Sequence, residues 1–179
     1  MRFIEWLKSI ELFDQSGKQA LMAIINTVVS QRTVLLQTNK EIRTLSRTEQ
    51  YCQKVSLLRS IPGIGLLTAM VVLTEIETME RFGSNDKFCN FIGLVPSMHS
   101  SGENDNIGDI TSRGHAILRS AIVESSWVAV RLDPALMKCF NTYCKRMDGN
   151  KAIVRIAKKL ASRIRYVLKN NKKYERGIV

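Results

Sequence analysis

The sequence has few residues that would interrupt helices. Among 179 residues there are three prolines and ten glycines, so long uninterrupted helices are allowed. No run of eighteen apolar residues occurs, and the sequence therefore predicts no membrane-spanning helix. The amino terminus carries acids within its apolar stretch and no small-residue cleavage site, so we expect no secretory signal.

Cysteine and histidine are also scarce. The only histidines are His99 and His115, and the four cysteines form no C-x-x-C pair. A zinc site would require distant ligands to meet, so we expect no metal site in this chain. We expect the cysteines to be reduced thiols in a protein of the bacterial cytoplasm. They are Cys52, Cys89, Cys139 and Cys144.

Positive charge is concentrated at one end of the chain. The net charge is +11, and from Lys138 onward thirteen Lys and Arg face only Asp148 and Glu175. The preceding 137 residues hold 14 basic and 14 acidic residues, so the whole excess lies in the last 42. Such a tail indicates a polyanionic partner, most often nucleic acid, although a solvated basic face would give the same count.

Helical patterns dominate, and we expect a mainly α fold. Residues 17–60 lack proline and, after Gly17, glycine, while Leu21, Val28, Leu35 and Ile42 recur in steps of seven. This heptad tendency predicts a long coiled-coil-like helix, or a helical arm packed on the main domain. A short helix is expected near residues 86–92, followed by helices near 115–131, after residue 134 and at 150–169.

The stretch SIPGIGLLTAMVVLTEI, residues 60–76, predicts a tight turn between two helices. Pro62 stops the first helix, and Gly63 and Gly65 permit the turn. A helix-hairpin-helix of this kind presents free backbone N–H groups to a DNA phosphate. An ordinary packing corner between two helices would account for the same residues.

The last predicted helix is amphipathic. Its apolar residues lie on one side, and its basic residues lie on the other side as a cationic ridge. We expect this ridge to bind nucleic acid. Its members are Lys151, Arg155, Lys158, Arg165 and Lys169.

A polar stretch, HSSGENDNIGDITSRGHAILRS at residues 99–120, predicts a loop that precedes a helix. Ser100 and Ser101 stand before a glycine, and Arg113, His115 and Arg119 follow the loop. A serine hydroxyl attacks phosphorus only when a base or nearby cations assist it, and guanidinium groups hold phosphate oxygens well. These residues alone are weak support for catalysis, because Ser-Ser-Gly occurs in many loops.

Five segments in order resemble the carboxy-terminal domain of the insertion-sequence 110/116/902 transposases. They are SIPGIGLLTA, ERFGSNDKFCNFIGLVPS, HSSGENDNIGDITSRG, LRSAIVESSWVAVRLDPAL and KAIVRIAKKL, which span about residues 57–168. The resemblance implies a DNA recombinase guided by a bridge RNA. It also implies that the serine before the S-G glycine, here Ser101, is the nucleophile, with Ser100 as the alternative.

The resemblance further implies an amino-terminal RuvC-like half whose four acidic residues bind Mg²⁺. About sixteen residues precede the helical arm, so we expect this chain to lack that half, to need no cofactor itself and to be catalytically incomplete alone. The predicted organisation is an arm at 1–56 and a transposase domain at 57–179. Within that domain we place the helix-hairpin-helix at 57–76, the serine loop at 96–113 and the basic helix at 150–169.

Two other functions fit the same residues. The chain could be a non-catalytic nucleic-acid-binding module, in which Ser101 is an ordinary loop residue. It could also be a helical assembly partner that dimerises through its amino-terminal arm, and the resemblance itself favours homodimers or larger synaptic assemblies associated with the nucleoid.

Overall fold

The computed structural model describes residues 2–11, 14–101, 104–111 and 113–175, and from 97 to 110 it describes the backbone alone. The chain divides into two units, Met1–Leu45 and Ser46–Val179. The boundary placed at 56/57 from the sequence lies inside a helix of the second unit. The described residues form eight helices and one two-stranded hairpin, which confirms the mainly α fold.

The first unit consists of α1 (Arg2–Ser9) and α2 (Gln15–Leu45). The carboxylate of Asp14 accepts hydrogen bonds from the amides of Ser16 and Gly17, so it caps the start of α2. The Ser16 hydroxyl and these amides hold the pKa of Asp14 below its usual value. Large apolar side chains stay exposed along α2, and Ile25 is buried. The exposed ones are Ile24, Val28, Val29, Val34, Leu35, Leu36 and Leu45.

The single helix expected over residues 17–60 is interrupted, so that prediction is wrong in this respect. The helix α2 ends at Leu45, and α3 (Glu49–Arg59) begins after a turn. Thr48 has an extended backbone at the start of α3, where its carbonyl accepts hydrogen bonds from the amides of Tyr51 and Cys52. Serine and threonine favour such helix boundaries over helix interiors, which explains the break.

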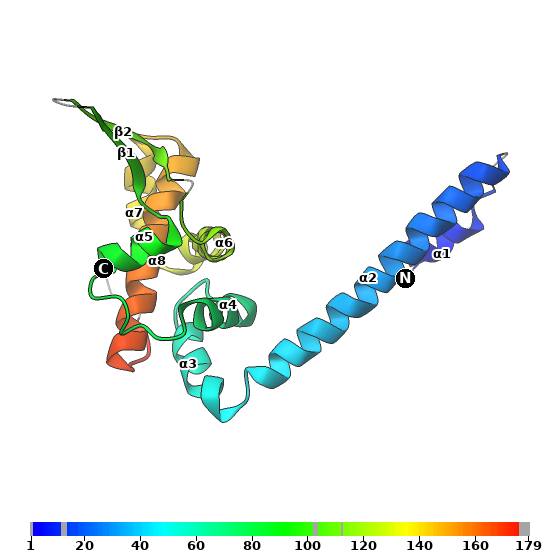
Figure 1. Ribbon diagram of the computed structural model, residues 1–179, viewed down its shortest axis with the longest axis horizontal. Coiled ribbons are helices and arrows are strands. Elements are labelled where there is room, and N and C mark those ends of the chain that lie inside the picture. Colours follow the sequence, from blue (N-terminus) through cyan, green and yellow to red (C-terminus); the bar gives the residue numbers. More distant parts are fainter. Residues whose placement is uncertain (1, 12–13, 102–103, 112, 176–179) are drawn as a thin grey trace. The chain divides into compact units, whose positions relative to one another are not determined.

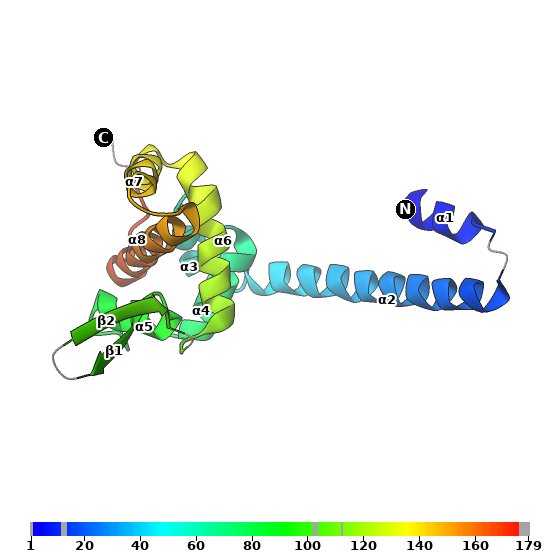
Figure 2. The ribbon, with the colours of Figure 1, turned by 90° about the horizontal axis from the view of Figure 1, so that it is seen from above.

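The second unit contains α3 and five further helices, and α8 packs against α3, α5, α6 and α7. Figures 1 and 2 show α8 surrounded by these elements. Burying an Ile or Leu side chain contributes about 1.5–3 kcal/mol, so the apolar side of α8 is a main source of stability. No helix within the described residues is long and apolar enough to cross a membrane. The bounds are α4 (Leu66–Ile76), α5 (Asn85–Ile92), α6 (Ala116–Leu132), α7 (Pro134–Cys144) and α8 (Gly149–Asn170).

The helix ends in this unit follow their local sequence. The Ser84 hydroxyl accepts a hydrogen bond from the amide of Lys87 at the start of α5, and Gly93 ends that helix with φ 85°. Asp133 caps α7, whose first residue is Pro134. Asp148 caps α8 in the same way. These boundaries agree with the sequence prediction.

A buried polar cluster joins the end of α6 to α8 and to the residues after α8. Asp133 is 1% exposed, and its Oδ2 lies 2.7 Å from Nη1 of Arg163 and 3.0 Å from the Tyr174 hydroxyl. The amide of Tyr174 donates to the Ser60 hydroxyl at 2.8 Å, and the Arg163 guanidinium lies over the Tyr174 ring. The segment after α8 is therefore tied to both α3 and α6.

The serine stretch is not the loop that the sequence predicted. Its backbone forms an antiparallel hairpin of β1 (Pro96–Ser101) and β2 (Asn104–Ile110), with a register shift between Pro96 and Met98. The segment lacks an alternating apolar pattern, and its strands are paired by backbone hydrogen bonds, which every non-proline residue can supply. Both views place the hairpin beside α5 (Figures 1 and 2).

Candidate nucleic-acid interface

Two glycines in contact fix the base of the hairpin. A Cβ atom on Gly114 would lie 2.6 Å from the Cα of Gly93, and Gly114 has φ 125°. The amide of Thr111 donates to the carbonyl of Val95, and the amide of His115 donates to the carbonyl of Phe91. The hairpin is thereby joined at its base to the end of α5 and the start of α6.

The two arginines after the hairpin have different environments. Arg119 Nη1 donates to the Thr111 carbonyl at 2.8 Å and also lies against Gly93, so this guanidinium supports the hairpin base. The Arg113 side chain is exposed, and its backbone amide donates to the Thr111 hydroxyl. Of the pair, Arg113 is the better placed to meet a polyanion.

His115 has two structural partners. Its Nδ1 accepts a hydrogen bond from the amide of Leu118 at 3.3 Å, which makes it the cap of α6. Its Nε2 lies 2.7 Å from Oε2 of Glu75 on α4. A neutral imidazole protonated at Nε2 satisfies both contacts. His115 therefore links α4 to α6, and binding of nucleic acid by this side chain stays a prediction.

The backbone of the two candidate serines lies at the end of β1. Ser100 is paired with Asp105 and Ser101 with Asn104. Their side chains, like Gly102, lie outside the described residues, so the expected approach of a hydroxyl to guanidinium groups stays a prediction.

The two turn glycines before α4 differ in their surroundings. Gly63 has φ 89°, and a Cβ there would lie 2.4 Å from the Ser125 carbonyl oxygen of α6. Gly63 is thus required by packing. Gly65 precedes α4 with no side-chain cap, and a Cβ on it would meet nothing within 4 Å. The backbone amides at the start of α4, next to the exposed Gly65, are the part of this turn that a phosphate can approach.

The basic residues of α8 fall into two groups. Arg165 Nη2 donates to the carbonyls of Phe82 and Gly83, so this guanidinium stabilises the loop before α5. Arg155 is exposed and lies over the ring of Tyr143. Lys158 forms an ion pair with Asp86 at 3.3 Å, in which Asp86 is largely exposed and Lys158 is half-buried. Lys151 and Lys169 are exposed.

Sequence analysis missed one cation on this face. Lys159 is exposed and lies one turn after Arg155, about 40° around the helix. On a helical wheel Lys159 lies beside the narrow basic stripe, but its long flexible side chain reaches across such an angle. The cationic ridge of α8 therefore comprises the exposed Lys151, Arg155, Lys159 and Lys169 together with the half-buried Lys158.

Metal ligands do not gather in the described part of the chain, where no group of three His, Cys, Asp or Glu side chains could hold an ion. The cysteines are free thiols. Burial raises the pKa of the Cys89 thiol, so it is less reactive than an ordinary exposed cysteine.

Comparison with known proteins agrees with the resemblance. Residues 55–141 match the model of the Transposase IS116/IS110/IS902 family. The chain is 28% identical over 135 residues to the transposase for insertion sequence element IS1111A of Coxiella burnetii, covering 73% of this chain and 36% of that protein. It is 27% identical over 135 residues to a probable family 20 transposase of Pseudomonas aeruginosa, covering 64% and 40%.

A third relative carries a different description. The pilin gene-inverting protein of Moraxella bovis is 28% identical over 137 residues, covering 73% of this chain and 42% of that protein. The chain thus spans well under half the length of these relatives.

The fold and the interface define a helical protein with a basic face and a glycine-anchored hairpin. This chain belongs to the IS116/IS110/IS902 transposase family.

Proposed function

We propose that this chain is a DNA-binding part of an insertion-sequence transposase and supplies the nucleophilic serine for strand exchange. The observation that carries the proposal is the cationic ridge of α8 in a chain of this transposase family. The ridge provides sequence-independent attraction to phosphates, and the turn at Gly65 adds backbone donors. The hairpin presents Ser101 from a base held by Gly93 and Gly114.

Binding to duplex DNA should depend steeply on salt. If the five ridge cations each contact a phosphate, the logarithm of the association constant should fall with the logarithm of salt concentration at a slope of about −4 to −5. Changing Lys151, Arg155 and Lys159 to glutamine should flatten this slope by about 2–3 units. Fluorescence anisotropy over a series of salt concentrations measures it.

A matched triple variant separates local contact from net charge. Lys8, Lys18 and Lys40 are exposed cations of the first unit, so their change to glutamine alters the net charge equally. We expect that variant to keep the parent slope. If both triple variants flatten the slope equally, binding does not take place on the ridge.

Ser101 would act by attack of its Oγ on a DNA phosphorus atom. The Oγ–P bond forms, the bond from phosphorus to the leaving deoxyribose oxygen breaks, and the serine proton passes to a base while that oxygen is protonated. Cations that stabilise the charge developing on the phosphoryl oxygens would have to approach from elsewhere in the assembly, because Arg113 follows the base of the hairpin and Ser101 lies at the outer end of β1. The metal-binding RuvC-like half implied by the family would complete the site, with Mg²⁺ bound there.

Loss of the Ser101 hydroxyl should abolish covalent protein–DNA adducts. The test joins this chain to a RuvC-like half of the same family and detects adducts by denaturing electrophoresis. We expect Ser101→Ala to give none while retaining DNA binding, and Ser100→Ala to remain active. Normal adduct formation by Ser101→Ala would refute the assignment, and loss only in Ser100→Ala would move it by one residue.

The same family supports two further parts of the proposal. A bridge RNA from the element is expected to bind the basic surface and to guide target choice. The exposed apolar residues of α2 are suited to a coiled-coil contact between two copies, which would bring two serines into one synaptic assembly. A non-catalytic DNA-binding module is the alternative function, and DNA binding without any covalent adduct from the parent chain joined to the RuvC-like half would favour it.

A further inference from the structure

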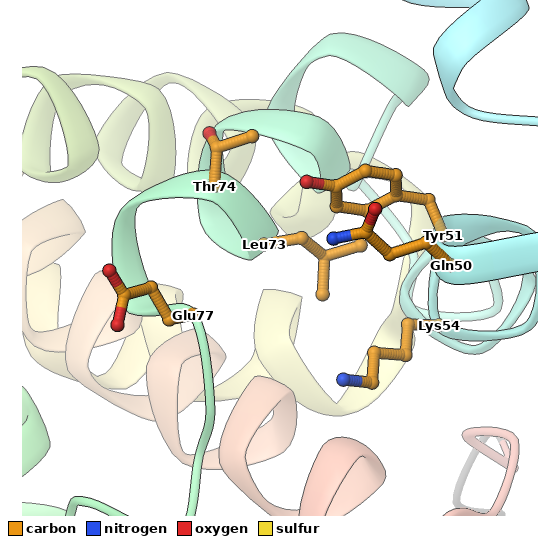
Figure 3. A pocket seen from close by; sticks show the side chains of 6 residues that line it. All are labelled: Gln50, Tyr51, Lys54, Leu73, Thr74 and Glu77. Carbon is orange, nitrogen blue, oxygen red and sulfur yellow. The ribbon is translucent and has the colours of Figure 1, made fainter. Parts of the chain in front are cut away.

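A cavity of about 210 Å³ lies between α3 and α4, at the end of this helix pair opposite the Gly65 turn. Gln50, Tyr51 and Lys54 come from α3, and Leu73 and Thr74 come from α4, with Glu77 just after it. Figure 3 shows Leu73 in the middle, the Tyr51 ring and Gln50 amide on one side and Glu77 on the other. The Lys54 ammonium extends between the two sides.

The cavity combines an apolar and aromatic wall with polar groups that lack protein partners. Leu73 is 4% exposed and closes the floor. In the part of the chain that the structure describes, no hydrogen bond or ion pair engages the side chains of Gln50, Tyr51 and Glu77. Such convergence of unpaired donors and acceptors around an apolar floor is typical of ligand sites.

Strained backbone forms one edge of this cavity. Glu77 has φ 56° and ψ −65°, and the amide of Thr78 donates to the carbonyl of Ile76 at 2.6 Å across it. This is the geometry of a classic γ-turn, which residues other than glycine rarely adopt. Strain of this kind persists where the surroundings enforce it, and it is concentrated at binding sites.

The size of the cavity limits what it can hold. Sites for drug-sized ligands occupy about 300–1,000 Å³, so this cavity has room for one planar ring and little more. An aromatic wall, an amide and a cation are the groups with which proteins bind an unpaired base and its phosphate. The Gln50 amide offers the donor and acceptor pair that matches adenine.

We propose that this cavity binds one unpaired nucleobase of the DNA substrate. The base stacks on Tyr51 above Leu73, its edge meets the Gln50 amide, and Lys54 meets the adjoining phosphate. Strand exchange requires bases to leave the duplex, and a site for one such base would hold the opened strand at the end of the α3 and α4 pair that lies away from the Gly65 turn. This inference rests on the proposed function, because it assumes that the chain binds DNA.

The test compares three duplexes of equal length with the intact chain. One is fully paired, one has a single unpaired adenine, and one has an abasic site in place of that adenine. Stacking on an aromatic side chain predicts that the unpaired adenine binds about 5- to 100-fold more tightly than the abasic duplex. Tyr51→Leu should remove this preference and Tyr51→Phe, which keeps the ring, should preserve it.

A spectroscopic readout checks the same contact. An unpaired 2-aminopurine should be quenched on binding to the parent chain and to Tyr51→Phe, and should remain bright with Tyr51→Leu. Equal affinity for the adenine and abasic duplexes, or a preference that survives in Tyr51→Leu, would overturn the inference while leaving the proposed function intact. Failure to bind even the fully paired duplex would overturn the proposed function and this inference with it.

Discussion

Replacing Asp133 with alanine is expected to lower the free energy of unfolding by about 3–5 kcal/mol, because it leaves the Arg163 guanidinium without its buried partner. Asp133 is 1% exposed, and its other oxygen accepts the amides of Ala135 and Leu136 that begin α7. The variant therefore loses a charge pair and a helix cap together. Urea unfolding followed by circular dichroism measures the change.

Two other substitutions make this result specific. Asp86→Ala removes an aspartate that is itself largely exposed, and it should change the free energy of unfolding by no more than about 1 kcal/mol. Tyr174→Phe removes only the hydroxyl that donates to Asp133 and should cost about 1 kcal/mol. If the Asp133 and Asp86 variants lost equal stability, the buried cluster would not be a major source of stability.

The same carboxylate predicts a dependence on pH. Burial raises the pKa of Asp133, but the amide of Leu136, the charge of Arg163 and the Tyr174 hydroxyl outweigh it and lower the pKa below its usual value. The stabilisation is therefore present at neutral pH and is lost as pH falls through the lower pKa of the folded state. The stability gap between the parent and Asp133→Asn should narrow below about pH 4.

Alanine at Gly63 is expected to lower the free energy of unfolding by about 2–5 kcal/mol. The left-handed backbone costs a residue with a Cβ about 1–2 kcal/mol. The new atom would also lie 2.4 Å from the Ser125 carbonyl oxygen, and relieving such overpacking costs about 1–3 kcal/mol more. Both costs arise where the turn packs against α6, so the midpoint temperature of thermal unfolding should decrease as well.

Gly65 is the matched control within the same turn. It has φ −84° and open space where a Cβ would stand, so Gly65→Ala should cost less than about 1 kcal/mol. Equal losses at both positions would mean that general flexibility of the turn, and not contact with α6, makes the glycines necessary.

Helix ends were predictable from sequence where a single residue determines them. Ser84, Gly93 and Pro134 act within one turn of their own position, and each boundary was predicted to within one residue. The break after Leu45 was missed, because no proline or glycine marks it and serine and threonine also occur inside helices. The hairpin was not predicted, because backbone hydrogen bonds pair its two strands and the side-chain pattern of residues 96–110 does not indicate that pairing.

The candidate site was only partly predictable for a related reason. A helical wheel places Arg165 on the ridge, but it cannot show that two carbonyls near Gly83 occupy the guanidinium. Likewise, the position of His115 beside a helix start suggested phosphate binding, while its partner Glu75 is forty residues away in sequence. Contacts between distant segments decided which cations remain exposed.

The contact between Gly93 and Gly114 has a consequence for the substitutions that this chain can tolerate. The two glycine backbones are in direct contact. A larger residue at either position would therefore push the base of the hairpin away from α5 and α6. Changes in composition or length beyond that junction leave the anchorage untouched. The point of attachment of the hairpin therefore tolerates almost no substitution, because a Cβ atom at either glycine would meet the other backbone.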